Sequence, residues 1–305
     1  MSQDHSHSHS HALPEELAGD KRVGAAISVN FLLTLVQIIA GVFSGSLALI
    51  ADAIHNLSDA LSLVIAFWAR KIARRPADTA MTFGYGRAEV VAAMVNYTTL
   101  IVIALYLAAQ GVERLFNPVE VEGWIVVIVA AVALVIDTLT ALLIFRLSKD
   151  SMNMRAAFLH NLADAMGSIA VIVAGTLILL YDWRLIDPIV TLFISGYILW
   201  HSFLGIRPVV RVLMLGSPQE TDLADLISAM ESVPEVESLH HVHFWKMQEH
   251  EAALEAHVVI TEGANTDRLR NDLKLLLQSR FDIAHSMLEL EHADVACLAA
   301  PKIGH

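Results

Sequence analysis

Apolar residues dominate the chain between Val23 and Gly205, where short polar breaks interrupt them at regular intervals. A helix needs about 20 apolar residues to span the hydrocarbon core of a bilayer, and each uninterrupted run is close to that length. Runs this long exclude the shorter, alternating strands of a membrane barrel. We therefore predict six transmembrane helices, at residues 23–43, 47–72, 89–111, 123–146, 156–181 and 188–206.

From about residue 208 the pattern becomes that of a soluble domain. Apolar residues at helical spacing predict two helices, one through Leu223, Leu226, Ile227 and Met230 after an N-cap at Thr221, and one through Leu269, Leu273, Leu276 and Leu277. Runs rich in Val, Ile and Phe, or alternating, predict strands at 239–245, 253–260 and 286–292. The order helix–strand–strand–helix–strand indicates a small α+β domain of the ferredoxin-like, metallochaperone-like type.

The loops at the two ends of the predicted membrane helices differ in positive charge. One end has only Arg114 and Arg184. The other has twelve basic residues: Lys21, Arg22, Arg70, Lys71, Arg74, Arg75, Arg87, Arg146, Lys149, Arg155, Arg207 and Arg211. Cytoplasmic loops carry the excess of Lys and Arg, so we expect both termini in the cytoplasm. The first twenty residues show no signal-peptide pattern, and a six-span chain of this kind fits a bacterial inner membrane.

Composition agrees with two domains in different solvents. The chain is 55% apolar and only 17% charged, whereas a soluble protein has about a quarter charged residues. The net charge is nevertheless −12, and residues 208–305 hold 16 acidic and 7 basic side chains, so most of the negative charge belongs to the predicted soluble domain. No basic patch indicates nucleic-acid binding. The single cysteine, Cys297, excludes an internal disulfide and a cysteine-based zinc cluster.

The N-terminal residues 1–20 form a polar segment in which histidines and serines alternate, at His5, His7, His9 and His11. A His-Ser repeat of this length is typical of a disordered tail that binds transition metals weakly, although an inert tail would have the same composition. The sequence thus predicts a tail (1–20), a six-helix transmembrane domain (21–207) and a cytoplasmic C-terminal domain (208–305).

Ionisable residues recur inside the predicted membrane helices, where they are costly and indicate function. His55 and Asp59 lie one turn apart in the second helix, and His160 and Asp164 repeat that spacing in the fifth. The six-residue strings that begin at the two histidines, HNLSDA and HNLADA, agree at five positions. Polar contacts between helices are the alternative explanation for a single such residue, but they do not explain a duplicated pair.

Two imidazoles and two carboxylates make a tetrahedral ligand set suited to Zn²⁺, and Co²⁺, Ni²⁺ and Cd²⁺ can use the same ligands. The set lacks the thiolates that Cu(I) prefers. Histidine titrates near pH ~6.5, and protonation of the ligands weakens metal binding. Metal and protons therefore compete for the site, which is the physical basis of an antiporter.

Four further polar residues lie near these ligands in the sequence or at similar depth. Asp52, Asn56 and Asn161 could support the ligands or line the route to them. Asp137, in the fourth predicted helix, could relay protons, support the site or only bond a neighbouring helix.

These features together resemble the cation diffusion facilitator family. The six spans, the paired His-x₃-Asp motif, the string FGYGRAE at residues 83–89 and the small acidic C-terminal domain carry the resemblance, which extends from Lys21 to Cys297. It implies a homodimeric secondary transporter, not an enzyme, that exports divalent transition metals, most often Zn²⁺, from the cytoplasm in exchange for protons. It also implies that the paired motif is the transport site.

The resemblance further implies that Zn²⁺ regulates the protein by binding the C-terminal domain, with ligands His240, His257, His292 and Asp294. The residues alone leave the choice among His240, His241 and His243 open. Strand alternation places His241 and His243 on one face and His240 on the other.

Two loop positions depart from the pattern of some relatives. A third zinc site of those relatives would need histidines where this chain has Met81 and Tyr85, although Asp78 is present, so we expect that site to be absent. Other relatives pair the position of Arg87 with an acid after the sixth span, where this chain has Met214.

Two other classes of protein bury or expose similar residues. An intramembrane metalloprotease needs a glutamate beside paired histidines, as in His-Glu-x-x-His; no such string occurs, and Glu89 lies near a membrane edge. A membrane metal sensor without transport would explain the C-terminal histidines but not a duplicated site in the membrane. We therefore favour metal export by alternating access.

Overall fold

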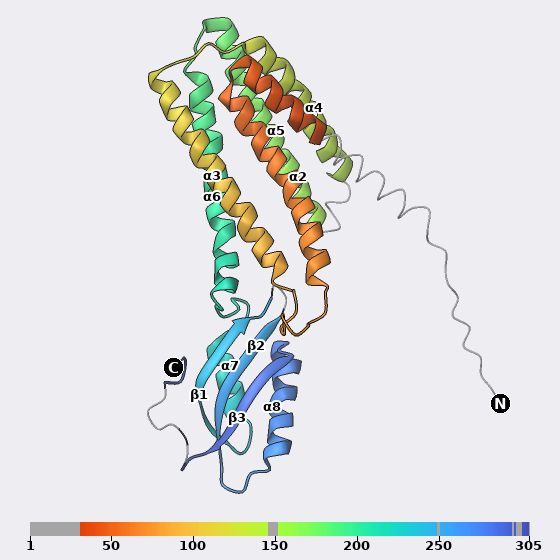
Figure 1. Ribbon diagram of the computed structural model, residues 1–305, viewed down its shortest axis with the longest axis vertical. Helices are drawn as coiled ribbons and strands as arrows, with labels where there is room; N and C mark the ends of the chain where they lie inside the picture. The colour runs from red at the N-terminus through yellow and green to blue at the C-terminus, as the bar shows by residue number, and fades with distance from the viewer. Residues whose placement is uncertain (1–30, 146–151, 249–250, 295, 297–300, 305) are drawn as a thin grey trace, which may run out of the picture. The chain divides into compact units, whose positions relative to one another are not determined.

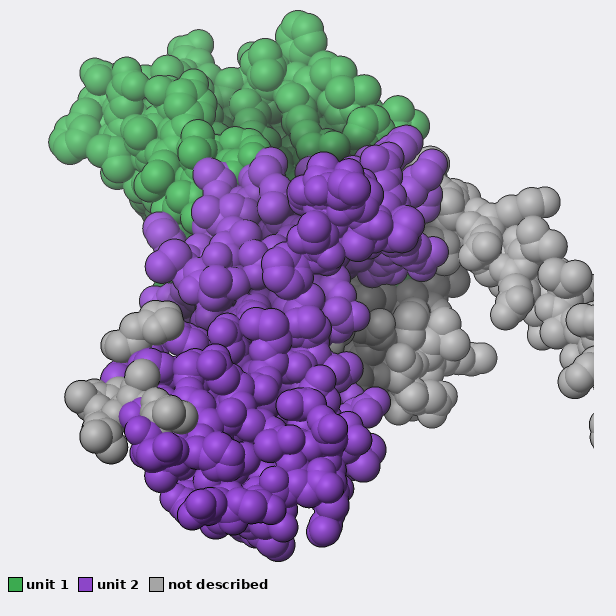
Figure 2. Space-filling model, turned by 60° about the horizontal axis from the view of Figure 1, so that its bottom comes forward, with its two compact units in different colours: residues 1–63, 99–201 green, residues 64–98, 202–305 purple. Residues whose placement is uncertain are grey.

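The computed structural model describes residues 31–145, 152–248, 251–294, 296 and 301–304. Within the helices, the side chains at 59, 60, 62, 63, 66, 143–145, 152–161 and 163 lie outside this description. The chain divides into two compact units, coloured green and purple in Figure 2. The first contains Met1–Leu63 and Thr99–His201, and the second contains Val64–Thr98 and Ser202–His305.

Long apolar helices make up the N-terminal two thirds of the described chain (Figure 1). A first helical stretch, Phe31–Ser44, is followed by α2 (Leu47–Ala73), α3 (Ala88–Phe116), α4 (Gly123–Phe145), α5 (Met152–Tyr181) and α6 (Ile186–Leu213). Four segments of the described residues are long and apolar enough to cross a membrane: Ala88–Phe116, Gly123–Leu142, Asp164–Tyr181 and Ile186–Leu213. Phe31–Ser44 and Leu47–Ser58 are shorter apolar helices. The predicted membrane-type helical region is confirmed.

Small residues bring the helices of the first unit together. Ala48, Ala104 and Ala130 are completely buried, whereas large apolar side chains such as Phe193 and Trp200 point outward. This is the distribution expected for helices surrounded by lipid, where close backbone approach replaces the hydrophobic effect as the source of association. The core of this unit therefore consists of close helix contacts.

Helices α4 and α5 pack against each other through two glycines. A Cβ atom at Gly123 would lie 2.8 Å from the carbonyl oxygen of Gly175, and one at Gly175 would lie 2.9 Å from Val127 Cγ2. Such separations are closer than ordinary van der Waals contacts, so both positions require glycine. Because Asp164 is on α5, this contact helps to set the position of a predicted ligand.

Asp187, in the first turn of α6, caps the N-terminus of α2. Its carboxylate is buried and accepts hydrogen bonds from Ser46 Oγ at 2.5 Å, the Leu47 N–H at 2.9 Å and the Ala48 N–H at 3.3 Å. The first N–H groups of a helix lack partners within the helix and carry a partial positive charge. A carboxylate from α6 therefore accepts hydrogen bonds from the otherwise unpaired N–H groups at the start of α2, the helix that carries His55.

Arg114, near the end of α3, completes this junction. Its Nη1 atom lies 3.9 Å from Asp187 Oδ2 and also donates a hydrogen bond to the carbonyl oxygen of Gly45. Gly45 has φ of 72°, a left-handed conformation that glycine adopts without strain. The ends of α2, α3 and α6 are thus joined by one buried acid and one arginine.

The C-terminal domain follows the predicted order of elements. It contains α7 (Leu223–Glu231), β1 (Val236–Lys246), β2 (Ala252–Ile260), α8 (Thr266–Phe281) and β3 (His285–His292). The strands form a sheet in the order β1-β2-β3, with β1 and β2 antiparallel and β2 and β3 parallel. The N-cap of α7 is Asp222, not Thr221, because the Asp222 carboxylate accepts a hydrogen bond from the Ala224 N–H at 2.9 Å. The predicted small α+β domain is otherwise confirmed.

One face of this sheet packs on the two helices. Leu254 and Val258 of β2, Met230 of α7 and Leu273 of α8 have no exposed surface and belong to one apolar core. Successive strand residues point to opposite faces of a sheet, so His257 lies on the face away from this core. The fold thereby leaves one face of the sheet for polar side chains.

We expect Asp187→Ala to lower the free energy of unfolding by about 3 kcal/mol, because it removes a cap and leaves Arg114 without its buried acid. Equilibrium unfolding of the detergent-solubilised protein measures this change. Asp182→Ala is the matched control: Asp182 forms an exposed ion pair with Arg184 at 3.0 Å, which contributes at most about 1 kcal/mol. Equal losses in the two variants would contradict the capping role.

Candidate metal sites

The structure describes two of the four predicted transport ligands, and they are in contact. His55 Nε2 of α2 lies 3.3 Å from Asp164 Oδ1 of α5. Both side chains are largely shielded, with 20% and 9% of their surfaces exposed. Each residue belongs to a different copy of the repeated motif, so the fold brings the two copies together. The side chains of Asp59, His160 and Asn161 lie outside the described residues.

Two further acids are buried in the same unit. Asp52 and Asp137 are each only 3% exposed. Asp52 Oδ2 accepts a hydrogen bond from Gln37 Nε2 at 2.9 Å, and Asp137 Oδ2 accepts one from Ser168 Oγ at 3.4 Å. Each predicted accessory acid therefore has a neutral donor as partner. Asn56, the other described accessory residue, is half-buried.

Gln37 was not singled out from the sequence, although its side chain, like that of Ser168, has no exposed surface. Its Oε1 atom has no hydrogen-bond partner among the described residues. The available signal was an amide in the middle of an apolar run. An amide buried at this depth is expensive unless it is bonded, and its bond to Asp52 explains its place.

Aromatic rings of α6 extend the neighbourhood of His55. The Tyr197 ring meets His55 edge-on with centroids 6.0 Å apart, and the His201 ring lies 5.0 Å from that of Tyr197. These residues are one turn apart on α6, which places them on the same face of that helix. Sequence reasoning missed both, since neither belongs to the repeated motif.

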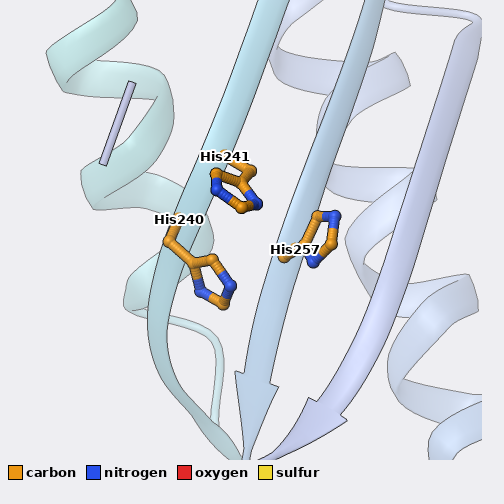
Figure 3. Close-up of side chains that lie close together, drawn as sticks. All are labelled: His240, His241 and His257. Atoms are coloured by element: carbon orange, nitrogen blue, oxygen red, sulfur yellow. The ribbon is translucent and has the colours of Figure 1, made fainter. Parts of the chain in front are cut away.

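Three histidines gather on the polar face of the C-terminal sheet (Figure 3). The ring centroids of His240, His241 and His257 are 5.0–5.1 Å apart in all three pairs. Their potential ligand nitrogens lie within 4.8 Å of one another. His240 and His257 are also direct partners across β1 and β2. Three imidazoles gathered in this way could hold a transition metal such as zinc.

A bulge in β1 explains why His240 and His241 both reach His257. The register of the β1–β2 ladder shifts between His240 and His243, and His241 has φ of 49°. The extra residue of a bulge interrupts strict alternation and redirects a side chain. The expectation that His241 lies on the opposite face from His240 is therefore wrong.

Two glutamates of β3 extend this cluster. Glu291 Oε1 contacts His257 Nδ1, and Glu291 Oε2 lies 3.5 Å from His240 Nε2. Glu289 Oε2 lies 3.5 Å from His257 Nε2. His240 Nε2 and Glu291 Oε2 are buried and have no hydrogen-bond partner among the described residues. Buried polar atoms that have an ion-pair contact but no hydrogen bond are typical of a site for an ion or water, and the mixed N and O donors fit zinc.

Two predicted C-terminal ligands lie elsewhere. His292 ends β3 and Asp294 follows it, and both side chains are exposed. Neither is in the close groups found among the described residues, so their part in metal binding stays a prediction. The predicted histidines at positions 5, 7, 9 and 11 lie outside the described residues.

The loop between α2 and α3 uses its acid for internal hydrogen bonds. Asp78 Oδ1 accepts from the N–H groups of Ala80 and Met81, and Oδ2 accepts from the Tyr85 hydroxyl, all at 2.8 Å. The Tyr85 bond and then the backbone bonds lower the pKa of Asp78. The tyrosine thus engages the acid, at one of the two positions where the predicted absence of a third zinc site rests on a missing histidine.

Arg87, at the end of the same loop, has a backbone partner. Its Nε atom donates a hydrogen bond to the carbonyl oxygen of Met247 at 2.8 Å. Met247 follows β1 directly. The arginine therefore bonds to the residue that follows β1. It does so although this chain has Met214, and not an acid, after the sixth predicted span.

Comparison with known proteins gives matches along almost the whole chain. The cation efflux transmembrane domain matches residues 23–214, and the cytoplasmic domain of cation efflux proteins matches residues 218–293. The chain is 34% identical to the zinc transporter ZitB of Escherichia coli, over 96% of this chain and 93% of that protein. It is 32% identical to the metal cation efflux system protein CzcD of Cupriavidus metallidurans, over 96% and 91%.

A third relative is named for its exchange chemistry. The cadmium, cobalt and zinc/H(+)-K(+) antiporter of Bacillus subtilis is 30% identical over 88% of this chain and 89% of that protein.

We expect Glu291→Gln to weaken Zn²⁺ binding at the C-terminal cluster by about 10- to 100-fold, because it removes the carboxylate that contacts both His240 and His257. Calorimetric titration of the full-length protein with Zn²⁺ measures this loss. Glu237→Gln, an exposed glutamate at the start of β1, is the matched control. Unchanged affinity in the Glu291 variant would remove the glutamate from the site.

We expect Tyr85→Phe to raise the pKa of Asp78 toward its ordinary value of 3.8, because the tyrosine bond is the largest cause of the lowered pKa. A depressed carboxylate pKa stabilises the loop above pH 3.8, and this stabilisation is lost as the pH falls through the folded-state value. As the pH falls, the loop of the variant should therefore lose its protection against hydrogen exchange at a higher pH than the loop of the wild type.

Hydrogen exchange of residues 78–85, compared between the two proteins from about pH 5 to about pH 3, tests this expectation. Tyr106→Phe, an exposed tyrosine of α3, is the control. Superimposable profiles for wild type and Tyr85→Phe would show that the hydroxyl does not hold Asp78.

Proposed function

The chain belongs to the cation diffusion facilitator family of cation efflux proteins, and we propose that it exports Zn²⁺ from the cytoplasm in exchange for protons by alternating access. It is an integral membrane transporter of divalent metal cations. The observation that carries the proposal is the contact between His55 and Asp164, which joins the two copies of the repeated motif.

The transport site in this proposal consists of His55, Asp59, His160 and Asp164. The spacing of each pair places its histidine and aspartate on one helix face. His55 of one pair meets Asp164 of the other, and the other member of each pair is four positions along the sequence from one of these two residues. Two carboxylates neutralise one divalent ion, so the loaded site has no net charge to bury in the membrane.

Zn²⁺ is the proposed substrate because two imidazoles and two carboxylates match its tetrahedral coordination. Co²⁺, Cd²⁺ and Ni²⁺ accept the same donors. The names of the relatives agree with this range, since they include zinc, cadmium and cobalt. Preference among these ions would depend on the groups that orient the ligands.

Proton exchange follows from the same ligands. When the ion leaves, uncompensated carboxylates in a poorly solvated site bind protons, and an imidazole does so near neutral pH. Asp52 and Asp137, buried beside Gln37 and Ser168, would add proton-accepting carboxylates at the same depth. The Bacillus subtilis relative is named as an antiporter that uses protons, which supports this coupling.

The C-terminal cluster is proposed as a regulatory metal site of a homodimer. Zn²⁺ bound by His240, His257 and Glu291, with His241 and Glu289 beside them, would draw β1, β2 and β3 together on one face of the sheet. His292 and Asp294 remain proposed ligands at the end of β3. The acidic surface of this domain would attract cytoplasmic cations, and both termini would lie on the cytoplasmic side of a bacterial inner membrane.

We expect Asp164→Asn to reduce Zn²⁺ flux at least about 100-fold, because the variant loses a ligand and a negative charge needed for a neutral loaded site. Proteoliposomes that contain one dye for zinc and one for internal pH measure both fluxes across an imposed pH gradient. Asp182→Asn, an exposed aspartate beside α6, should transport normally.

The two dyes separate the parts of the proposal. Loss of both fluxes in the Asp164 variant, with retained folding, supports a shared site for metal and protons. Zinc flux in wild-type protein that is independent of the pH gradient would overturn proton exchange. Normal zinc flux in the Asp164 variant would overturn the site.

A further inference from the structure

A large apolar cavity lies within the second compact unit, beside the end of α2 and the start of α3. This is the end of the helices where most of the basic loop residues lie. The volume of the cavity is about 880 Å³, which is within the range of ligand-binding cavities. The walls come from the last turns of α2, the loop from Ala80 to Gly86, the first turns of α3 and the end of β1. None of the described residues that line it is a histidine, so its chemistry differs from that of the metal sites.

The walls combine aromatic and aliphatic side chains. Trp68 and Val64 of α2, Phe83 of the loop, Val91 of α3 and Trp245 of β1 all line the space. Trp68 and Phe83 remain 57% and 75% exposed in the chain by itself. Tryptophan at the end of a membrane helix is typical of the boundary between lipid tails and headgroups. The cavity therefore opens at the depth of that boundary.

Basic side chains surround the same region. Arg87 lines the cavity, and Arg75 is close enough to act electrostatically on the hydroxyl of Tyr85, another wall residue. Lys71 Nζ lies 5.3 Å from the centre of the Trp68 ring. The nearby acids already have partners, since Asp78 bonds to Tyr85 and Glu89 lies 3.9 Å from Arg70. An apolar interior with a basic border matches a molecule with an apolar chain and an anionic head.

The C-terminal domain closes one side of this space. Arg87 bonds to the Met247 carbonyl, and the side chain of Gln248 occupies the position that a Cβ atom at Gly86 would need. Met247 and Gln248 also line the cavity. An occupant would thus touch both the membrane helices and a domain that matches the cytoplasmic domain of cation efflux proteins.

We propose that this cavity binds a bilayer phospholipid with an anionic headgroup, with an acyl chain inside the cavity and the phosphate beside Arg75 and Arg87. The charge of the border selects the anionic lipid, because each basic residue near a membrane surface contributes attraction for such headgroups. The bound lipid joins the turn after β1 to the ends of α2 and α3. Binding at this position is separate from transport of the metal itself.

Trp245 provides a direct probe, because it lies on a strand of the cytoplasmic domain yet lines the cavity. The full-length protein is placed in nanodiscs of phosphatidylglycerol with brominated acyl chains, which quench tryptophan on contact. The Trp245 signal is the tryptophan fluorescence of the wild type minus that of the Trp245→Phe variant. We expect loss of most of this signal in brominated discs and no loss in unbrominated discs.

Two pairs of variants test the cavity and its border. Ala92→Phe fills the cavity and should restore the Trp245 signal, whereas Ala93→Phe, the same change at the next residue of α3, should not. The preference for the anionic lipid is the quenching of Trp245 by brominated phosphatidylglycerol relative to that by brominated phosphatidylcholine. Arg75→Gln should lower this preference roughly fivefold. Arg268→Gln, on exposed α8, should leave it unchanged.

The remaining outcomes overturn the proposal. An unquenched Trp245 in both lipids excludes an acyl chain from the cavity. A Trp245 signal that is protected only when two copies associate would assign the cavity to a second chain. Equal quenching by both lipids in all variants would show an apolar surface without headgroup selection.

Discussion

A charged group in hydrocarbon is stable only beside a partner, and this constraint governs the membrane half of the protein. Asp187 has the amide groups of α2, Ser46 and Arg114, and Asp52 has Gln37. His55 and Asp164 have each other. The contacts of Asp187 connect the ends of helices, whereas the contact between His55 and Asp164 uses groups that a metal ion can bind instead. Structure and proposed transport therefore depend on the same electrostatic requirement.

The C-terminal domain meets a different requirement, because water can solvate its charges. One face of its sheet supplies the apolar core, so the other is free to collect polar side chains. A bulge adds His241 to the pair formed by His240 and His257, and the parallel strand β3 brings Glu289 and Glu291 alongside. Three strands thus contribute donors to one surface, and a bound ion would connect all three.

Local patterns predicted much of this protein. Apolar runs located the helices, and alternation located the strands, because both depend on neighbours a few residues away. The repeated motif predicted that His55 and Asp164 would meet. Contacts between distant segments were not predictable in this way. The cap by Asp187, the bulge at His241 and the approach of Glu291 to His257 depend on packing and register that no short window contains.

The hydrogen bond from Arg87 is accepted by a backbone carbonyl, that of Met247, and this acceptor determines which mutations the contact tolerates. Every residue supplies a carbonyl, so replacement of the Met247 side chain leaves the acceptor in place. The position of that carbonyl is instead set by the number of residues between β1 and β2. The hydrogen bond from Arg87 should thus persist when Met247 is substituted and be lost when residues are inserted into or deleted from the turn. At Met247 this bond therefore depends on where the backbone lies and not on which side chain the residue carries.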